Sequence, residues 1–124
     1  MKKTVLIIED EAGIANAFKK QLELIAGYDV VWCDKGKEAI EAVKKSKFDV
    51  ILLDLVMPDF DGVAFLKEYR SLDAEKSKTP IIVLTNVTSD ETKKEVEEFN
   101  VRKYIIKTNI IPSELIGSIE EVTK

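Results

Sequence analysis

Histidine is missing from this sequence of 124 residues, and cysteine, proline and glycine are scarce, with one, three and five residues respectively. Without histidine, the chain offers no imidazole base, no imidazole metal ligand and no residue that could become a phosphohistidine. The single Cys33 can form no internal disulfide, and its place at the end of an apolar run predicts a buried structural thiol. Carboxylates, hydroxyls and amines are therefore the groups left for chemistry.

Long apolar runs are also missing, since none approaches the roughly 20 residues that a membrane-spanning helix needs. The first run, residues 5–8, is ended by Glu9-Asp10-Glu11 and is too short for a signal peptide, so we expect a cytoplasmic protein. The net charge is −4 and no basic cluster is interleaved with aromatics, which argues against direct binding of nucleic acid or membranes. The length and the 45% of hydrophobic residues predict a single globular domain over residues 1–124.

Five short apolar runs, each about as long as a strand buried on both faces, alternate with segments that have helical spacing. The runs are residues 5–8, 30–33, 50–53, 81–84 and 104–106. The helical segments carry their apolar residues at Ile14, Phe18, Leu22 and Ile25, at Ala39, Ile40 and Val43, at Leu66 and Tyr69, at Val96 and Phe99, and at Leu115, Ile119 and Val122, with Pro112 at the first position of the last. This alternation predicts a doubly wound (βα)5 α/β fold, a flavodoxin-like three-layer sandwich whose parallel sheet has the order 2-1-3-4-5.

Three carboxylates follow two of the predicted strands, Glu9 and Asp10 after the first and Asp54 after the third. In such a sheet the ligand crevice lies beyond the carboxyl ends of the strands, here between the first and the third. Carboxylates held a few ångströms apart repel one another, and a shared proton or a bound divalent cation reduces this repulsion. Oxygen ligands with open positions suit Mg²⁺. The alternative for Glu9-Asp10-Glu11 is an acidic first turn of a helix, whereas Asp54 leaves a dry strand where an unpaired charge is expensive.

A hydroxyl and an amine lie at the ends of two further predicted strands: Thr85 ends the fourth, and Lys107 follows the fifth. Each has an ordinary structural explanation when taken alone, because a strand-end threonine is often a turn residue and a strand-end lysine is often solvated. Their joint placement at the edge that carries Asp54 favours a common site.

Together these features resemble the receiver domain of response regulators, the chemotaxis-regulator-like domain of two-component signalling. The resemblance runs from the first strand to the last helix. It rests on Glu9-Asp10, Asp54, the loop 57–62 with the sequence Met-Pro-Asp-Phe-Asp-Gly, Thr85, and the segment from Tyr104 to Lys107.

The resemblance implies that Asp54 accepts a phosphoryl group from a phosphohistidine of a sensor kinase or phosphotransfer protein, or from a small acyl phosphate. Mg²⁺ would be bound by Asp10, Asp54 and the backbone carbonyl of Val56, with Glu9 acting mainly through water. Lys107 would neutralise charge on the phosphoryl oxygens. The chain would catalyse only its own phosphorylation and dephosphorylation, and would not be an enzyme in the usual sense.

The resemblance also implies a switch, in which Thr85 binds a phosphoryl oxygen and Tyr104 turns into the space that the threonine vacates. The readout surface would be the fourth helix, fifth strand and fifth helix. It would act on a downstream protein or a fused output domain, and a phosphorylation-dependent dimer is a further expectation. An ordinary half-buried aromatic is the alternative explanation for Tyr104.

The sequence departs from the family pattern at three positions. Thr108 follows Lys107 where a proline, often in a cis peptide, is usual, so we expect a trans or differently shaped loop. Asn86 takes the place of a small residue and is expected to narrow the site or to hydrogen-bond in it. Asn100 stands where glycine is common, and asparagine tolerates the left-handed conformation of such a turn.

Val56 and Val87 are expected to flank the phosphoryl site and to exclude hydrolytic water, which predicts a long-lived phosphorylated state. An aspartyl-phosphate phosphatase of the haloacid-dehalogenase kind would need an Asp-x-Asp pair at the first strand, and this chain has Asp54-Leu55-Val56 at the third. A flavodoxin-like cofactor binder would need a hydroxyl- and glycine-rich loop where the acidic residues stand. A phosphorylation-independent interaction module on the same fold stays open as the alternative.

Overall fold

Five parallel strands form one sheet in the order β2-β1-β3-β4-β5 in the computed structural model, which describes residues 2–57, 61–72, 74 and 77–124. The strands are β1 (Thr4–Ile8), β2 (Asp29–Cys33), β3 (Val50–Leu53), β4 (Ile81–Thr85) and β5 (Val101–Ile106). The helices are α1 (Ala12–Ala26), α2 (Gly36–Lys45), α3 (Gly62–Arg70), α4 (Asp90–Glu97) and α5 (Pro112–Val122), with a short 3-10 helix at Lys107–Asn109. The predicted flavodoxin-like α/β fold and its strand order are confirmed.

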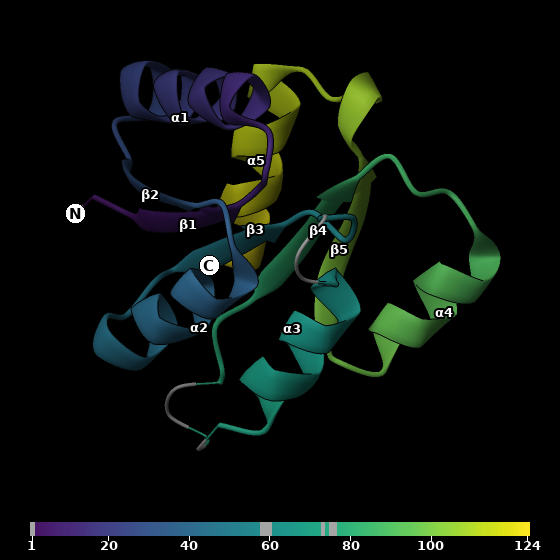
Figure 1. Cartoon of the computed structure of the whole chain (residues 1–124). Helices are drawn as coiled ribbons and strands as arrows, with labels where there is room; N and C mark the ends of the chain where they lie inside the picture. Colours follow the sequence, from purple (N-terminus) through teal and green to yellow (C-terminus); the bar gives the residue numbers. More distant parts are fainter. Residues whose placement is uncertain (1, 58–60, 73, 75–76) are drawn as a thin grey trace.

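Helices cover both faces of this sheet, α1 and α5 on one and α2, α3 and α4 on the other (Figure 1). Because successive strand residues point to opposite faces, Leu6 and Ile8 join the core under α2 and α3, while Val5 and Ile7 join the core under α1 and α5. This burial on both faces explains why the central strands are written as unbroken apolar runs.

The sheet edge and the helix ends account for the differences from the predicted elements. β5 begins at Val101 rather than Tyr104, because it is an edge strand whose first residues are partly exposed and are not a continuous apolar run. α4 ends at Glu97, so Phe99 lies beyond it, and Asn100 has the predicted left-handed backbone with a φ of 57°. In α1, Ile25 is exposed rather than buried, and Ala26 continues the apolar stripe from Leu22.

Two further predictions concern Cys33 and the helices. Cys33 is buried as expected, and burial, with the charges of Glu38 and Asp34 adding to it, raises the pKa of its thiol to about 11. In the described part of the chain, no helix has the length and apolar character needed to cross a membrane.

Candidate functional site

Strand pairing brings the predicted site residues to one edge of the sheet. Ile8 of β1 pairs with Leu53 of β3, and the N–H of Asp54 donates to the Ile8 carbonyl at 3.1 Å, so Glu9 and Asp54 emerge side by side. On the other side of β3, Thr85 is the last residue of β4 and pairs with Ile106 of β5. Lys107 therefore leaves β5 at the same edge.

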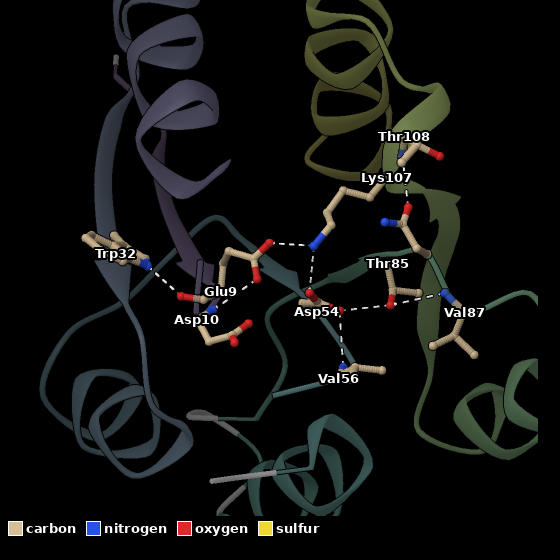
Figure 2. A network of polar contacts seen from close by, with 10 residues as sticks. Glu9, Asp10, Trp32, Asp54, Val56, Thr85, Val87, Lys107 and Thr108 are labelled. Atoms are coloured by element: carbon tan, nitrogen blue, oxygen red, sulfur yellow. Dashed lines mark hydrogen bonds and ion pairs between the residues drawn. The ribbon is translucent and has the colours of Figure 1, made fainter. Parts of the chain in front are cut away.

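Glu9, Asp10 and Asp54 form a carboxylate cluster in which one oxygen of each residue lies within 4.8 Å of the others. Glu9 and Asp54 are buried, while Asp10 is half-buried. The Glu9 backbone carbonyl accepts a hydrogen bond from the Trp32 indole N–H at 2.7 Å, and the Glu9 carboxylate accepts one from the Asp10 N–H at 3.0 Å (Figure 2). Both bonds fix the end of β1 and aim Glu9 at the cluster.

Lys107 supplies the positive charge of the site and bridges two of the three carboxylates. Its Nζ lies 2.6 Å from Glu9 Oε1 and 2.8 Å from Asp54 Oδ2, as Figure 2 shows. All three side chains are nearly buried, which makes each of these ion pairs stronger than a surface pair. One ammonium nevertheless faces two carboxylates, so the charge of the cluster is not fully compensated.

The pKa values of the two buried carboxyls move in opposite directions. Burial raises the pKa of Glu9 from its ordinary 4.5 to about 7; the bond to Lys107 opposes this shift, and the neighbouring Asp54 adds to it. Burial also acts to raise the pKa of Asp54, but hydrogen bonds from Lys107, the Val56 N–H and Thr85 outweigh it and hold that pKa below its ordinary value. Asp54 is therefore the ionised member of the pair at neutral pH, where a proton occupies Glu9 in about half of the molecules.

A Glu9→Gln variant is expected to remove a pH dependence of stability from the metal-free chain. Because the folded-state pKa of Glu9 is raised from 4.5 to about 7, the stability that its proton confers is present below 4.5 and lost as the pH rises through 7. Asp54 is ionised in both folded and unfolded states over this window and adds no slope. Between about pH 5 and about pH 8 the wild type should lose on the order of 2 kcal/mol relative to Glu9→Gln.

Urea unfolding in a chelating buffer at the two pH values measures this difference. Glu11→Gln is the matched control, since Glu11 is exposed and lies outside the carboxylate cluster. Equal slopes for the wild type and Glu9→Gln would contradict the assignment of the proton to Glu9.

Thr85 and Tyr104 are linked to Asp54 through the loop that follows β4. Thr85 is buried and its hydroxyl donates to Asp54 Oδ1 at 2.8 Å, while the Val87 N–H lies 3.4 Å from that hydroxyl (Figure 2). The Tyr104 hydroxyl donates to the Val87 carbonyl at 2.6 Å, and its ring lies under the Lys93 ammonium. Thr85 thus contacts the carboxylate directly, and Tyr104 contacts the loop that follows Thr85.

The carboxylate cluster opens into a cavity of about 470 Å³ beside Asp54. Its lining includes Asp10, Asp54, Val56, Thr85, Val87 and Lys107. Three carboxylates with one lysine, together with the raised pKa of Glu9, fit a hard divalent cation bound by oxygen ligands. The Val56 N–H donates to Asp54 Oδ1 at 3.1 Å and orients this carboxylate. The predicted loop 57–62 is described only at Met57, Asp61 and Gly62, since residues 58–60 lie outside the described residues.

A family model for the response regulator receiver domain matches residues 5–120, nearly the whole chain. The chain belongs to the response regulator receiver domain family. Receiver domains are parts of two-component signalling and are not catalytic enzymes, in agreement with the sequence prediction.

Relatives of this receiver domain include larger regulators. It is 33% identical over 123 residues to a probable transcriptional regulator, ycf27, of Porphyridium aerugineum, a match that covers 99% of the chain and 49% of that protein. It is 34% identical over 120 residues to the cell cycle response regulator CtrA of Brucella ovis, covering 97% and 50%. The chain thus spans about half the length of the curated relatives it matches.

Among solved structures, the chemotaxis protein CheY4 of Vibrio cholerae superposes on the receiver domain with a TM-score of 0.88 and 32% identity. The match covers 98% of this chain and 99% of that one. A likeness over the full length of both chains agrees with the strand order and helix layers described above.

Sequence reasoning missed contacts that depend on side-chain geometry around the site. No sequence pattern predicts the hydrogen bond from the Trp32 indole to the Glu9 carbonyl. The sequence places only an aromatic residue on the neighbouring strand, where Trp32 pairs with Ile7. Asn86 was expected to narrow the site or to hydrogen-bond in it, and its Oδ1 accepts from the Thr108 N–H at 3.0 Å. The described peptide bonds include no cis bond, so the loop after Lys107 is trans as the departure at Thr108 predicted.

Proposed function

We propose that this receiver domain is the phosphoacceptor of a two-component phosphorelay, taking a phosphoryl group onto Asp54 in a Mg²⁺-dependent reaction and switching a partner-binding surface. The observation that carries the proposal is the set of contacts on the two oxygens of Asp54. Oδ2 faces the Lys107 ammonium, and Oδ1 accepts from the Thr85 hydroxyl and the Val56 N–H. An ionised carboxylate with a cation and a hydroxyl beside it, at a cavity, is suited to attack phosphorus.

In the proposed step, a carboxylate oxygen of Asp54 attacks the phosphorus of a phosphohistidine, and the bond from phosphorus to the imidazole nitrogen of the donor breaks. The product is an acyl phosphate on Asp54 and a free histidine on the kinase or phosphotransfer protein. The lowered pKa of Asp54 keeps the nucleophile ionised. Lys107 and the Thr85 hydroxyl, which contact the carboxylate, would bind oxygens of the incoming phosphoryl group.

Asp10, Asp54 and the backbone carbonyl of Val56 would hold Mg²⁺, with Glu9 acting through water. When bound, the ion would supply positive charge to the equatorial phosphoryl oxygens and help to hold the phosphorus in line between the attacking oxygen and the leaving nitrogen. Glu9 would lose its proton on metal binding, because the positive charge of the ion would lower the pKa of a carboxyl beside it.

Switching would follow from the contacts of Thr85 and Tyr104 with the loop after β4. A phosphoryl group that binds the Thr85 hydroxyl favours the inward position of this loop, and Tyr104 donates to the same loop at Val87. The surface formed by α4, β5 and α5 would then present the change to a downstream protein, to a fused output domain or to a second phosphorylated copy. Residues 1–124 would act as one domain in the cytoplasm.

Intact-mass measurement after incubation with acetyl phosphate and Mg²⁺ tests the proposal. One added phosphoryl group per chain is expected with Mg²⁺, and none in a chelating buffer. A wild-type chain that takes up no phosphoryl group under these conditions would instead support the alternative, a phosphorylation-independent interaction module.

The lifetime of the acyl phosphate is expected to depend on Val56 and Val87, which both line the cavity. Threonine has nearly the shape of valine but carries a hydroxyl in place of one methyl group. A double variant with Val56→Thr and Val87→Thr should therefore order water near the phosphorus and hydrolyse the acyl phosphate about tenfold faster. Decay of the phosphorylated mass after removal of acetyl phosphate measures this rate. Val31→Thr, at an exposed position of β2, is the matched control. Decay of the wild type within minutes would count against the role of these valines.

A further inference from the structure

We infer that Asn86 is a positioning residue for Lys107, acting through a hydrogen bond to the turn that carries this lysine; the inference rests on the phosphorylation of Asp54 proposed above. The Asn86 side-chain oxygen Oδ1 accepts from the backbone N–H of Thr108 at 3.0 Å. Asn86 also lines the cavity beside Asp54. It therefore belongs to the edge of the site and touches the residue directly after Lys107.

The strand register explains why the side chain is needed at this point. Thr85 and Ile106 form the last described pair between β4 and β5. Beyond this pair the chain turns into the 3-10 helix Lys107–Asn109, whose first N–H groups have no acceptor within the helix. The Asn86 side-chain oxygen accepts a hydrogen bond from one of these groups, the Thr108 N–H. This bond links the chain segments after β4 and β5 beyond the last paired residues. A proline at 108 would have no N–H to donate.

Lys107 depends on the position of this turn because its ammonium makes two short contacts at once. Nζ lies 2.6 Å from Glu9 and 2.8 Å from Asp54, which are held by β1 and β3. A shift of the turn would lengthen both contacts together. The proposed reaction needs the Lys107 ammonium in contact with a phosphoryl oxygen. A displacement of this ammonium by about 1 Å would therefore slow phosphoryl transfer, even with the carboxylates in their original positions.

Three consecutive residues after the middle of β4 make three separate contacts. Thr85 donates to Asp54, Asn86 accepts from Thr108, and Val87 accepts from Tyr104. The Asn86 bond ties the loop directly after Thr85 to the turn that carries Lys107. The two side chains proposed to bind the phosphoryl group are thereby held in register with one another.

The bond from Thr108 to Asn86 could serve only to stabilise the 3-10 helix, or it could position Lys107 for phosphoryl transfer. Measuring Mg²⁺ affinity beside the rate of phosphorylation separates these two roles. Mg²⁺ affinity depends on the carboxylates, whereas the rate of phosphoryl transfer depends also on Lys107. A positioning role thus predicts a lower rate at unchanged Mg²⁺ affinity. The single Trp32, which donates to the backbone of Glu9, gives an intrinsic fluorescence signal for metal binding.

The test compares the wild type with Asn86→Leu, which has a similar size but no acceptor, and with Ser89→Ala. Ser89 lies in the same loop and accepts from the Thr92 N–H at the start of α4, but makes no described bond to the turn 107–109. With acetyl phosphate at saturating Mg²⁺, Asn86→Leu should be phosphorylated about fivefold more slowly, because the Lys107 ammonium is held less well at the phosphoryl oxygen. Its Mg²⁺ dissociation constant should stay within about twofold of the wild type. Ser89→Ala should match the wild type in both.

Amide exchange of the Thr108 N–H, measured by NMR, reports the bond itself and should be faster in Asn86→Leu. Equal phosphorylation rates in Asn86→Leu and the wild type would overturn the inference, as would a parallel loss of Mg²⁺ affinity or an equal loss of rate in Ser89→Ala. A wild type that takes up no phosphoryl group would overturn the proposed function and this inference with it. A reactive wild type with an equally reactive Asn86→Leu overturns the inference alone.

Discussion

Phosphoryl transfer from acetyl phosphate is expected to fall by about 1,000-fold or more in an Asp54→Ala variant, because the variant lacks the proposed nucleophile. The remaining carboxylates cannot replace it. Glu9 contacts Lys107 but makes no described bond to Thr85. Asp10 makes no described bond to either Lys107 or Thr85. Intact mass after incubation with acetyl phosphate and Mg²⁺ should therefore show the unmodified chain alone.

Asp49→Ala is the matched control, because Asp49 directly precedes β3 and Asp54 directly follows it. Its carboxylate accepts from the Thr4 N–H at 2.7 Å and is exposed at the opposite end of the strand. Asp49→Ala should take up a phosphoryl group as the wild type does. A phosphoryl group that survives Asp54→Ala, or one that is lost in Asp49→Ala, would contradict the assignment of the acceptor.

The central part of the fold could be predicted because its strands are buried on both faces. Residues 5–8 and 50–53 are apolar without interruption, which few structures other than the middle of a parallel sheet require. The edges gave weaker patterns. β5 pairs with β4 alone, and its first residues Val101 to Lys103 include two charged side chains, so the start of this strand could not be separated from the preceding turn.

The site could be predicted at the level of which residues meet, because parallel strands end at a common edge. Asp54 after β3 and Lys107 after β5 meet for that reason alone. The finer contacts depend on rotamers and on register past the strand ends. That one lysine would bridge both Glu9 and Asp54, or that Asn86 would reach Thr108, is set by side-chain directions that no spacing in the sequence encodes.

Gly62 packs against the backbone of Asp54 and Leu55, and a side chain at position 62 would collide with these main-chain atoms. It begins α3, and its N–H donates to the Leu55 carbonyl at 3.0 Å. A Cβ added to Gly62 would lie 2.6 Å from Leu55 Cα and 2.9 Å from the backbone oxygen of Asp54. Both neighbours are main-chain atoms of the segment that carries Asp54, so no flexible side chain can move aside.

Gly62→Ala is therefore expected to lower the free energy of unfolding by about 3 kcal/mol, since the backbone of Asp54 and Leu55 or the start of α3 has to shift. The same shift moves the carboxylate relative to Lys107 and should slow phosphorylation about tenfold or more. Gly117→Ala in α5 is the matched control: its added Cβ meets nothing within 4 Å. Gly117→Ala should instead gain about 0.5–1 kcal/mol from helix propensity. Urea unfolding and acetyl phosphate labelling of both variants measure the two effects. A Gly62→Ala variant as stable and as reactive as Gly117→Ala would show that the segment after β3 can yield, and that the close approach of α3 does not hold Asp54 in place.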